Sequence, residues 1–225
     1  QVEKYVEACV NDCNYEHIVQ PGMVYISFPT ENGTVYSKRE LSELRKVCLK
    51  YKLPLFIDGA RLGYGIKASG NDLTLPDIAA LCDVFYIGGT KNGALFGEAV
   101  VITNNAFKKD FRNIIKQRGG MLAKGRLLGI QFMTLFSDDL YFRLAEHAVK
   151  TAAKIKNALK NKGIEFLFDS PTNQIFPVFP DEIYEKLSKK FSFAFWENVD
   201  EKRTAVRICT SWATKESDVA ELIKA

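Results

Sequence analysis

Two short apolar segments end in side chains that could carry chemistry. One runs Leu-Phe-Ile-Asp over 55–58 and delivers the carboxylate Asp58; the other runs Phe-Tyr-Ile-Gly-Gly-Thr-Lys over 85–91 and delivers the amine Lys91. A lysine can form a Schiff base with an aldehyde, and a carboxylate favours the protonated form of a pyridine nitrogen. Together they are the groups that an enzyme uses to bind pyridoxal 5'-phosphate, provided that the amine is neutral, which burial favours.

The surroundings of the pair allow this chemistry and a plainer interpretation. Glycines at 88, 89 and 93 would leave room for a bulky ring close to the backbone. An aspartate after a strand commonly caps a turn, however, and a lysine in a glycine-rich loop is commonly solvated. Neither residue defines a site by itself, but their positions at successive strand ends favour one.

Two arginines are candidates for an anion site. Arg207 lies in the otherwise apolar stretch Thr-Ala-Val-Arg-Ile-Cys-Thr over 204–210, where a charge needs a partner. A substrate α-carboxylate would accept two hydrogen bonds from this guanidinium group, and a salt bridge at a strand edge is the alternative. Arg61, shortly after Asp58, is a second anion donor near the same crevice.

Helices and strands alternate in the part of the chain that must position Asp58 and Lys91. Periodicity predicts helices over 2–11, 40–51, 76–81 and 105–117, and strands over 23–27, 55–58, 84–87 and 98–103. This alternation predicts a largely parallel sheet covered by helices. Ligands bind outside the carboxyl ends of the strands in such a sheet, so Asp58 and Lys91 can face one crevice.

The second part of the chain has a different character. A long helical region, interrupted near 119–120 and 137, runs to about 162; short strands are then predicted over 164–168, 174–179, 191–196 and 204–210, and helices over 180–190 and 215–224. The predicted fold class is α/β, a three-layer sandwich with a mostly parallel central sheet plus a smaller C-terminal α+β domain. We place the large domain at 1–140 and the small domain at 141–225, linked by the long helix.

Composition argues against several functional classes. Of 225 residues, 47% are hydrophobic and 26% are charged, and the net charge of +4 is not concentrated in a basic run. We therefore expect no nucleic-acid partner, and no apolar stretch is long enough to suggest a membrane partner. The cysteine count of five is odd, which favours reduced thiols and a cytoplasmic protein.

A metal site is the other chemistry that the sequence pattern raises. Cys9, Cys13 and His17 follow the i, i+4 spacing of one helix face. No fourth ligand lies near them in the sequence, so ordinary reduced cysteines are the favoured interpretation. We expect no metal.

Five segments of the chain together resemble a known family. They are Pro-Thr-Glu-Asn-Gly-Thr-Val-Tyr-Ser at 29–37, Asp-Gly-Ala-Arg-Leu at 58–62, Gly-Gly-Thr-Lys-Asn-Gly at 88–93, Arg-Gly-Gly-Met-Leu-Ala-Lys-Gly-Arg at 118–126 and Val-Arg-Ile-Cys-Thr-Ser-Trp-Ala-Thr at 206–214. The chain resembles, essentially from end to end, the L-threonine aldolase and aromatic amino acid β-eliminating lyase family of fold-type-I pyridoxal-phosphate enzymes. The aspartate and lysine segments are the most specific of the five.

The resemblance implies roles for the candidate residues. Lys91 would form the internal aldimine with pyridoxal 5'-phosphate, Thr90 would lie beside it in the cofactor site, and Asp58 would pair with the pyridinium nitrogen. Arg61 would lie near the phenolic oxygen of the cofactor and the substrate carboxylate. Arg207 would bind that carboxylate.

The resemblance also implies a homo-oligomer. The 118–126 segment is similar to the family segment that approaches the cofactor phosphate of a neighbouring subunit. Lys124 is our candidate for that contact, and Arg118 and Arg126 are alternatives. A shared site would make the protein a homodimer or a homotetramer.

The chain departs from the family pattern at its N-terminus. Family members carry a further N-terminal segment with a phosphate-binding turn, a ring-stacking histidine and a histidine implicated in the aldol step. His17 and His147 match neither histidine; we expect the first to be structural or at the surface and the second to be exposed on the long helix. We therefore expect the large, cofactor-binding domain at 1–140 to be incomplete in this chain.

The function implied by the resemblance is that of a pyridoxal-phosphate-dependent lyase acting on a small amino-acid substrate. It would cleave L-threonine-like β-hydroxy amino acids to glycine and an aldehyde through an external aldimine at Lys91. One alternative is β-elimination of the tryptophanase, tyrosine phenol-lyase or cysteine desulfhydrase type, or other pyridoxal-phosphate chemistry such as transamination or racemisation. Another is a truncated chain without catalytic competence.

Overall fold

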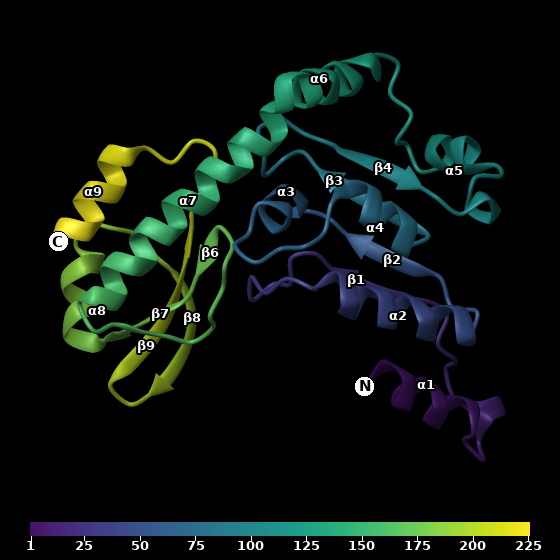
Figure 1. Cartoon of the computed structure of the whole chain (residues 1–225), viewed down its shortest axis with the longest axis horizontal. Coiled ribbons are helices and arrows are strands. Elements are labelled where there is room, and N and C mark those ends of the chain that lie inside the picture. The colour runs from purple at the N-terminus through teal and green to yellow at the C-terminus, as the bar shows by residue number, and fades with distance from the viewer.

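The computed structural model describes residues 1–225 and builds them around two β-sheets (Figure 1). A helix of 22 residues, α7 (Leu140–Asn161), runs from the first sheet to the second. The predicted division into domains at 140/141 stays a prediction, but the two sheets have separate hydrophobic clusters.

The first sheet has the strand order β1-β2-β3-β4. Its strands are β1 (Val24–Ser27), β2 (Leu55–Asp58), β3 (Val84–Gly88) and β4 (Glu98–Ile102). The first three are parallel and β4 is antiparallel to β3. The helices α2 (Lys38–Lys50), α3 (Leu62–Ile66) and α4 (Leu75–Leu81) lie in the connections between the parallel strands. Because the strands are parallel, β2 and β3 both end at one edge, which we call the carboxyl edge.

Local sequence signals fix where the connecting helices begin. Ser37 and Glu40 form a reciprocal capping box at the start of α2, and Thr74 and Asp77 form another at the start of α4. Pro76 occupies the first turn of α4, where its missing N–H costs nothing. These caps set the lengths of the connections that return the chain to the start of each strand.

The two faces of the first sheet differ in cover. Leu55, Ile57 and Phe85 point into the main hydrophobic cluster, which residues of α2 and α4 complete. On the opposite face, which we call the open face, Tyr25 is 52% exposed and Val100 is 50% exposed. The sequence predicts a sheet covered by helices, and in the structure α2 and α4 cover one face of it.

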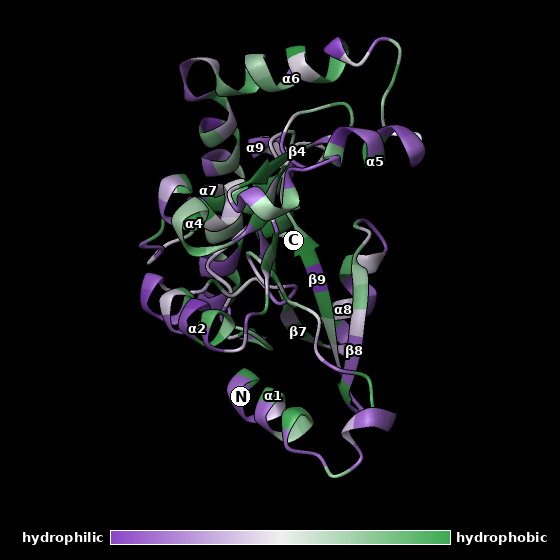
Figure 2. Ribbon diagram, turned by 90° about the vertical axis from the view of Figure 1, so that its right-hand side faces the viewer, coloured by the Kyte–Doolittle hydropathy of each residue, from purple (hydrophilic) through white to green (hydrophobic).

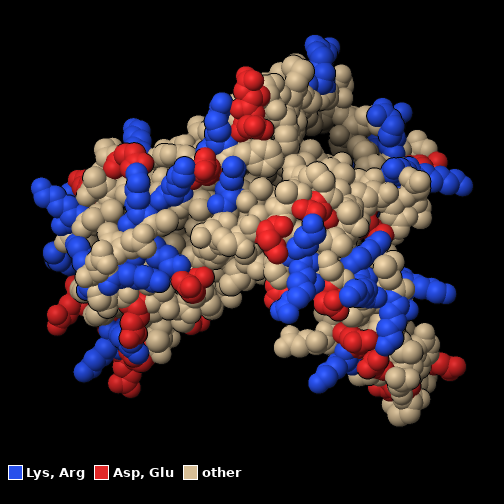
Figure 3. Space-filling model, in the orientation of Figure 1, with Lys and Arg blue, Asp and Glu red and all other residues tan.

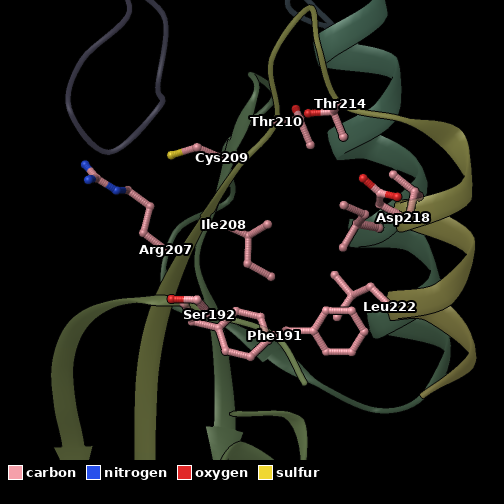
Figure 4. Close-up of a pocket in the computed structure, with 12 residues that line it drawn as sticks. Phe191, Ser192, Arg207, Ile208, Cys209, Thr210, Thr214, Asp218 and Leu222 are labelled. Atoms are coloured by element: carbon pink, nitrogen blue, oxygen red, sulfur yellow. The ribbon is translucent and has the colours of Figure 1, made fainter. Parts of the chain in front are cut away.

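The second sheet is antiparallel and is built around its central strand, β9 (Arg203–Cys209). The other strands are β5 (Glu165–Phe166), β6 (Gln174–Ile175), β7 (Pro177–Pro180) and β8 (Ala194–Asp200), and the helices are α8 (Asp181–Ser188) and α9 (Glu216–Lys224). Val206 and Ile208 of β9 face the cluster formed with α7 and α9, so Arg207 and Cys209 face the other side (Figure 4).

Most predicted elements are present, with shifted ends. The helix predicted over 105–117 is a 3-10 turn (Asn105–Phe107) followed by α5 (Phe111–Gln117), because Asp110 adopts a left-handed φ of 57°. The strand predicted over 174–179 is divided into β6 and β7, and the one predicted over 191–196 begins at Ala194. The long helical region is α6 (Arg126–Phe136), a short turn and α7.

Two expectations from the sequence, one about Cys9 and Cys13 and one about His147, are wrong. The first helix, α1 (Val2–Val10), ends before Cys13, so Cys9 and Cys13 do not share a helix face. His147 is half-buried rather than exposed, and its Nε2 lies 2.9 Å from the carbonyl oxygen of Thr214. No group of three or more metal-ligating side chains occurs in the structure, and no helix is long and apolar enough to cross a membrane.

Candidate active site

Asp58 ends β2 at the carboxyl edge and receives hydrogen bonds from neutral donors. The phenols of Tyr25 and Tyr86 each donate to one of its oxygens, and the N–H of Ala60 donates at 2.9 Å. Burial alone would raise the pKa of the carboxyl, but these three hydrogen bonds, with a smaller contribution from the charge of Lys91, hold the pKa below its usual value. Asp58 is therefore ionised, and no cation is hydrogen-bonded to it.

The loop that carries Lys91 is fixed through its backbone. The carboxylate of Glu98, the first residue of β4, accepts a hydrogen bond from the N–H of Gly89 at 2.8 Å and one from the hydroxyl of Thr90 at 3.3 Å. The phenol of Tyr64 donates to the carbonyl of Lys91. These contacts hold the main chain of the loop, and the side chain of Lys91 is exposed.

Asn92 and Tyr141 anchor the same loop to α7. The amide of Asn92 donates to the carbonyl of Tyr141 at 2.8 Å, and the phenol of Tyr141 donates to the carbonyl of Gly88 at 3.0 Å. The N–H of Gly63 in turn donates to that phenol at 3.1 Å. The end of β3, the start of α3 and the start of α7 are thus joined through one buried tyrosine.

The surroundings of Lys91 differ from the sequence prediction in two respects. Its side chain is exposed, whereas the sequence analysis invoked a buried amine. A Cβ added to Gly88 would lie 2.4 Å from the carbonyl oxygen of Ala60, and one added to Gly89 would lie 2.8 Å from that of Gly97. These glycines permit close packing of backbone against backbone instead of leaving space for a ring.

Arg61 and Arg207 approach each other through a shared carboxylate. Arg61 precedes α3, Arg207 lies on β9, and Glu31 lies in the loop after β1. Each arginine contacts one oxygen of Glu31. Oε2 lies 3.4 Å from Nη1 of Arg61, and Oε1 lies 3.1 Å from Nη1 of Arg207. Arg207 also stacks over Trp196, with 5.7 Å between the guanidinium carbon and the ring centroid.

Cys209 shows that these charges converge on one region. Burial raises the pKa of its thiol, while the positive charges of Arg207, Arg61 and Lys91 act in the opposite direction. Lys91 and the two arginines thus lie near enough for their charges to act on one thiol, and Lys91 lies near enough for its charge to act on Asp58. The apolar cavity of about 230 Å³ in Figure 4 lies on the other side of β9, where Ile208 and Leu222 line it.

Lys124 is not brought to this group. It lies in an exposed turn just before α6, and no hydrogen bond or ion pair joins its side chain to another residue. Arg118 and Arg126, the alternatives to Lys124, are also exposed and unpaired. In Figure 1, α5 and α6 lie next to β4, which β3 separates from β2 in the sheet.

Sequence reasoning missed four residues that hold the site. Tyr25 and Tyr86 orient Asp58, Glu98 holds the lysine loop, and Glu31 bridges the arginines. Alternation along the strands could have found Tyr86, because it lies on the same face of the sheet as Asp58. Glu31 lies within the motif at 29–37 but carries no spacing signal of its own.

Known proteins share the sequence pattern and the fold of this chain. The family model described as beta-eliminating lyase matches residues 2–181. A low specificity L-threonine aldolase from Pseudomonas sp. (strain NCIMB 10558) is 31% identical over 207 residues, which cover 92% of this chain and 59% of the relative. The structure of a threonine aldolase from Leishmania major matches with a TM-score of 0.90 and 45% identity, covering 93% of this chain and 61% of that chain.

More distant structures share the fold alone. An aspartate aminotransferase from Thermus thermophilus matches with a TM-score of 0.65 at 13% identity, covering 92% of this chain and 56% of that chain. The matches confirm the predicted α/β fold class of the fold-type-I kind. The chain spans only about 60% of the length of the aldolases it matches.

Proposed function

This chain belongs to the beta-eliminating lyase family, and from that premise we propose that it acts as a pyridoxal-5'-phosphate-dependent lyase on L-threonine-like β-hydroxy amino acids, giving glycine and an aldehyde. The observation that carries the proposal is the grouping of Lys91, Asp58 and the two arginines, Arg61 and Arg207, in a chain 45% identical to a threonine aldolase. The family resemblance carried by the five sequence motifs is confirmed.

The residues at the carboxyl edge fit this cofactor. Asp58 is an ionised carboxylate whose hydrogen-bond donors are all uncharged, so it can accept a further hydrogen bond from a pyridinium N–H. Lys91 is exposed on a loop whose backbone is fixed, so its amine can reach an aldehyde. Thr90 and Arg61 carry further hydrogen-bond donors.

When bound, pyridoxal phosphate withdraws electrons from the α-carbon of the amino acid. Asp58 would keep the pyridine nitrogen protonated, because its negative charge stabilises the cation. Lys91 would hold the aldehyde group and accept or return a proton at its Nζ atom. Arg207 would orient the substrate through its α-carboxylate, with Trp196 holding the plane of the guanidinium group.

Product analysis tests the proposal. Cofactor-treated protein is incubated separately with L-threonine, L-serine, L-cysteine and L-tryptophan. We expect acetaldehyde and glycine from L-threonine in equal amounts. Pyruvate and ammonia from L-serine or L-cysteine would instead favour β-elimination, the activity for which the matching family model is named.

Absence of any turnover would refute the lyase proposal for this chain. A catalytically incompetent chain is then the remaining interpretation, and cofactor binding separates its two forms. A visible absorption band that Lys91→Ala abolishes would show that the site binds the cofactor without turning over substrate. A colourless protein would show that it does not bind the cofactor.

We also propose that the protein is a homodimer or homotetramer. The support is the exposed apolar side of α6, where Leu127 is 53%, Ile130 47% and Met133 67% exposed (Figure 2). Lys and Arg side chains gather over the adjacent α5 (Figure 3) and in the 118–126 segment, where Lys124 could meet an anionic group of a second copy.

Solution mass measurements test this assembly. We expect multi-angle light scattering to give a multiple of the 25.4 kDa chain mass and the double variant I130E/M133E to shift the protein towards the monomer. Val19→Glu is the matched control, because Val19 is 92% exposed in a different part of the chain. A monomeric unmodified protein would refute the proposal.

A further inference from the structure

The contact between Glu31 and the two arginines has no role in the function proposed above. Arg61 and Arg207 both reach one carboxylate, so their guanidinium groups are close neighbours. Their side chains are only 17% and 27% exposed, so water screens their mutual repulsion poorly. An anion between them reduces this repulsion, and in this chain Glu31 supplies it.

The main chain of Glu31 is held firmly. Gln174, which is fully buried, donates from Nε2 to the carbonyl oxygen of Glu31 at 3.2 Å. Nearby, the hydroxyl of Ser170 donates to the carbonyl of Gly33 at 3.3 Å. The φ of Gly33 is +78°, and an added Cβ there would lie 2.1 Å from Oγ of Ser170, so the turn fits closely against the second sheet.

The side chain of Glu31, by contrast, is held weakly. It is 59% exposed, and it makes one contact to each arginine instead of the paired contacts of a bidentate ion pair. The exposure of the carboxylate to water weakens both ion pairs. The carboxylate can therefore leave the arginines without disturbing the turn that carries it.

Arg207 is not fully satisfied by Glu31. Its Nε is buried and has no hydrogen-bond partner. Glu31 contacts only Nη1, so Nη2 of the guanidinium group keeps donors for a second carboxylate, and the stacked Trp196 limits rotation of the group. An incoming carboxylate that used the Nη1 atoms of both arginines would need the position that Glu31 occupies.

We propose that Glu31 is a displaceable internal counter-ion that holds Arg61 and Arg207 together and competes with the α-carboxylate of the substrate for them. This inference rests on the proposed function for the identity of the competing ligand, an amino acid with a free carboxylate. Glu31 is accordingly a specificity-determining residue that acts through the arginines.

Anion binding tests the competition without cofactor or turnover. Trp196 stacks on Arg207, and the chain has two tryptophans, so the background W212F leaves Trp196 as the only fluorophore of its kind. Sodium acetate is titrated at constant ionic strength, with chloride replacing acetate in the reference series. We expect Glu31→Gln to lower the dissociation constant of acetate about three- to tenfold, because it removes an anionic competitor of similar size.

Two further variants separate competition from general effects of charge. Glu43→Gln removes the same charge from an exposed position on α2 and is expected to leave the dissociation constant unchanged. Glu31→Asp keeps the competing charge and is expected to bind acetate more weakly than Glu31→Gln. The proposal is overturned if Glu31→Gln weakens acetate binding or leaves it unchanged, or if neither protein binds acetate.

A second readout separates this inference from the proposed lyase function. In an active enzyme, Glu31→Gln should lower KM for L-threonine with little change in kcat, since the residue competes for substrate and takes no part in bond cleavage. If acetate binds more tightly but no amino acid is turned over, the inference stands and the lyase proposal fails. If the enzyme turns over an amino acid but Glu31→Gln leaves acetate binding unaltered, the lyase proposal stands and the inference fails.

Discussion

Asp58 and Asp83 lie at opposite edges of the same four-stranded sheet and have opposite surroundings. Asp83 precedes β3 and is 3% exposed. It accepts two hydrogen bonds from the guanidinium group of Arg45 and one each, at 2.8 Å, from the N–H of Leu55 and the amide of Asn104. Asp58 ends β2 at the carboxyl edge and is hydrogen-bonded only to uncharged donors.

The difference separates a structural carboxylate from one that is available for chemistry. At Asp83 a guanidinium group neutralises the charge, and burial leaves no room for a ligand. At Asp58 the charge is kept ionised by hydrogen bonds but is not neutralised by a bonded cation. In α/β sheets ligands bind outside the carboxyl ends of the strands, and of these two aspartates only Asp58 lies at that end.

The largest effect on activity is expected from loss of the Lys91 amine at the carboxyl edge. Lys91→Ala should reduce turnover of L-threonine on the order of a thousand-fold or more, because no other side chain here supplies a nucleophilic amine. Stability should change by less than about 0.5 kcal/mol, since the side chain is exposed. Steady-state kinetics and urea unfolding check the two parts. Retention of more than a tenth of the activity would exclude Lys91 as the reacting residue.

A substitution at the opposite edge of the sheet should lower the free energy of unfolding. Asp83→Asn leaves the charge of Arg45, whose side chain is 20% exposed, without its counter-ion, so we expect a loss of about 3 kcal/mol in the free energy of unfolding. Urea unfolding followed by circular dichroism measures it. The kcat of the protein that remains folded should be unchanged. A loss of activity without a loss of stability would contradict the structural role.

Asp58→Asn is the matched change at the carboxyl edge. The amide cannot stabilise a protonated pyridine nitrogen, so we expect kcat to fall about a hundred-fold, or about 2.7 kcal/mol in the barrier. The free energy of unfolding should change by less than in Asp83→Asn, because Asp58 has no bonded cation to leave unpaired. The comparison between the edges fails if the two asparagine variants lose stability equally.

The same contrast explains what the sequence could predict. Asp58, Lys91 and the ends of β2 and β3 were predictable, because short apolar runs stopping at a polar residue mark buried strands. The break at Asp110 was not, since a left-handed φ at an aspartate has no periodic signal. The role of Asp83 was hidden because its partner, Arg45, lies on a separate helix far along the chain.

Contacts between the two sheets were the hardest part of the site to predict. Arg207 was found because a charge interrupts an apolar strand, but its partner Glu31 is 176 positions away and lies in an irregular loop. The exposure of Lys91 was also missed, because a pattern of strand ends gives the position of a side chain and not its cover. Sequence periodicity thus predicts which residues lie at the carboxyl edge better than it predicts which side chains surround them.

The smallest predicted effect concerns the phenols that keep Asp58 ionised. The folded-state pKa of Asp58 lies below its usual value, so the ionised carboxylate contributes stability that is fully present above the unfolded-state pKa of about 4 and is lost as the pH falls through the folded-state pKa. Tyr86→Phe removes one donor and keeps the ring. The pKa of Asp58 should therefore rise, and the acid-unfolding midpoint should rise with it by less than about one pH unit.

A matched phenol shows whether this shift belongs to Asp58. Tyr5→Phe removes a hydroxyl from a tyrosine that is 66% exposed and makes no side-chain hydrogen bond, so its acid-unfolding midpoint should equal that of the unmodified protein. Circular dichroism at decreasing pH gives both midpoints. Adding Asp58→Asn to Tyr86→Phe should abolish the difference, since no titrating carboxyl then remains for the phenol to act on. If the Tyr86→Phe shift survives in that double variant, the phenol stabilises the open face by packing, and the ionised state of Asp58 does not depend on it.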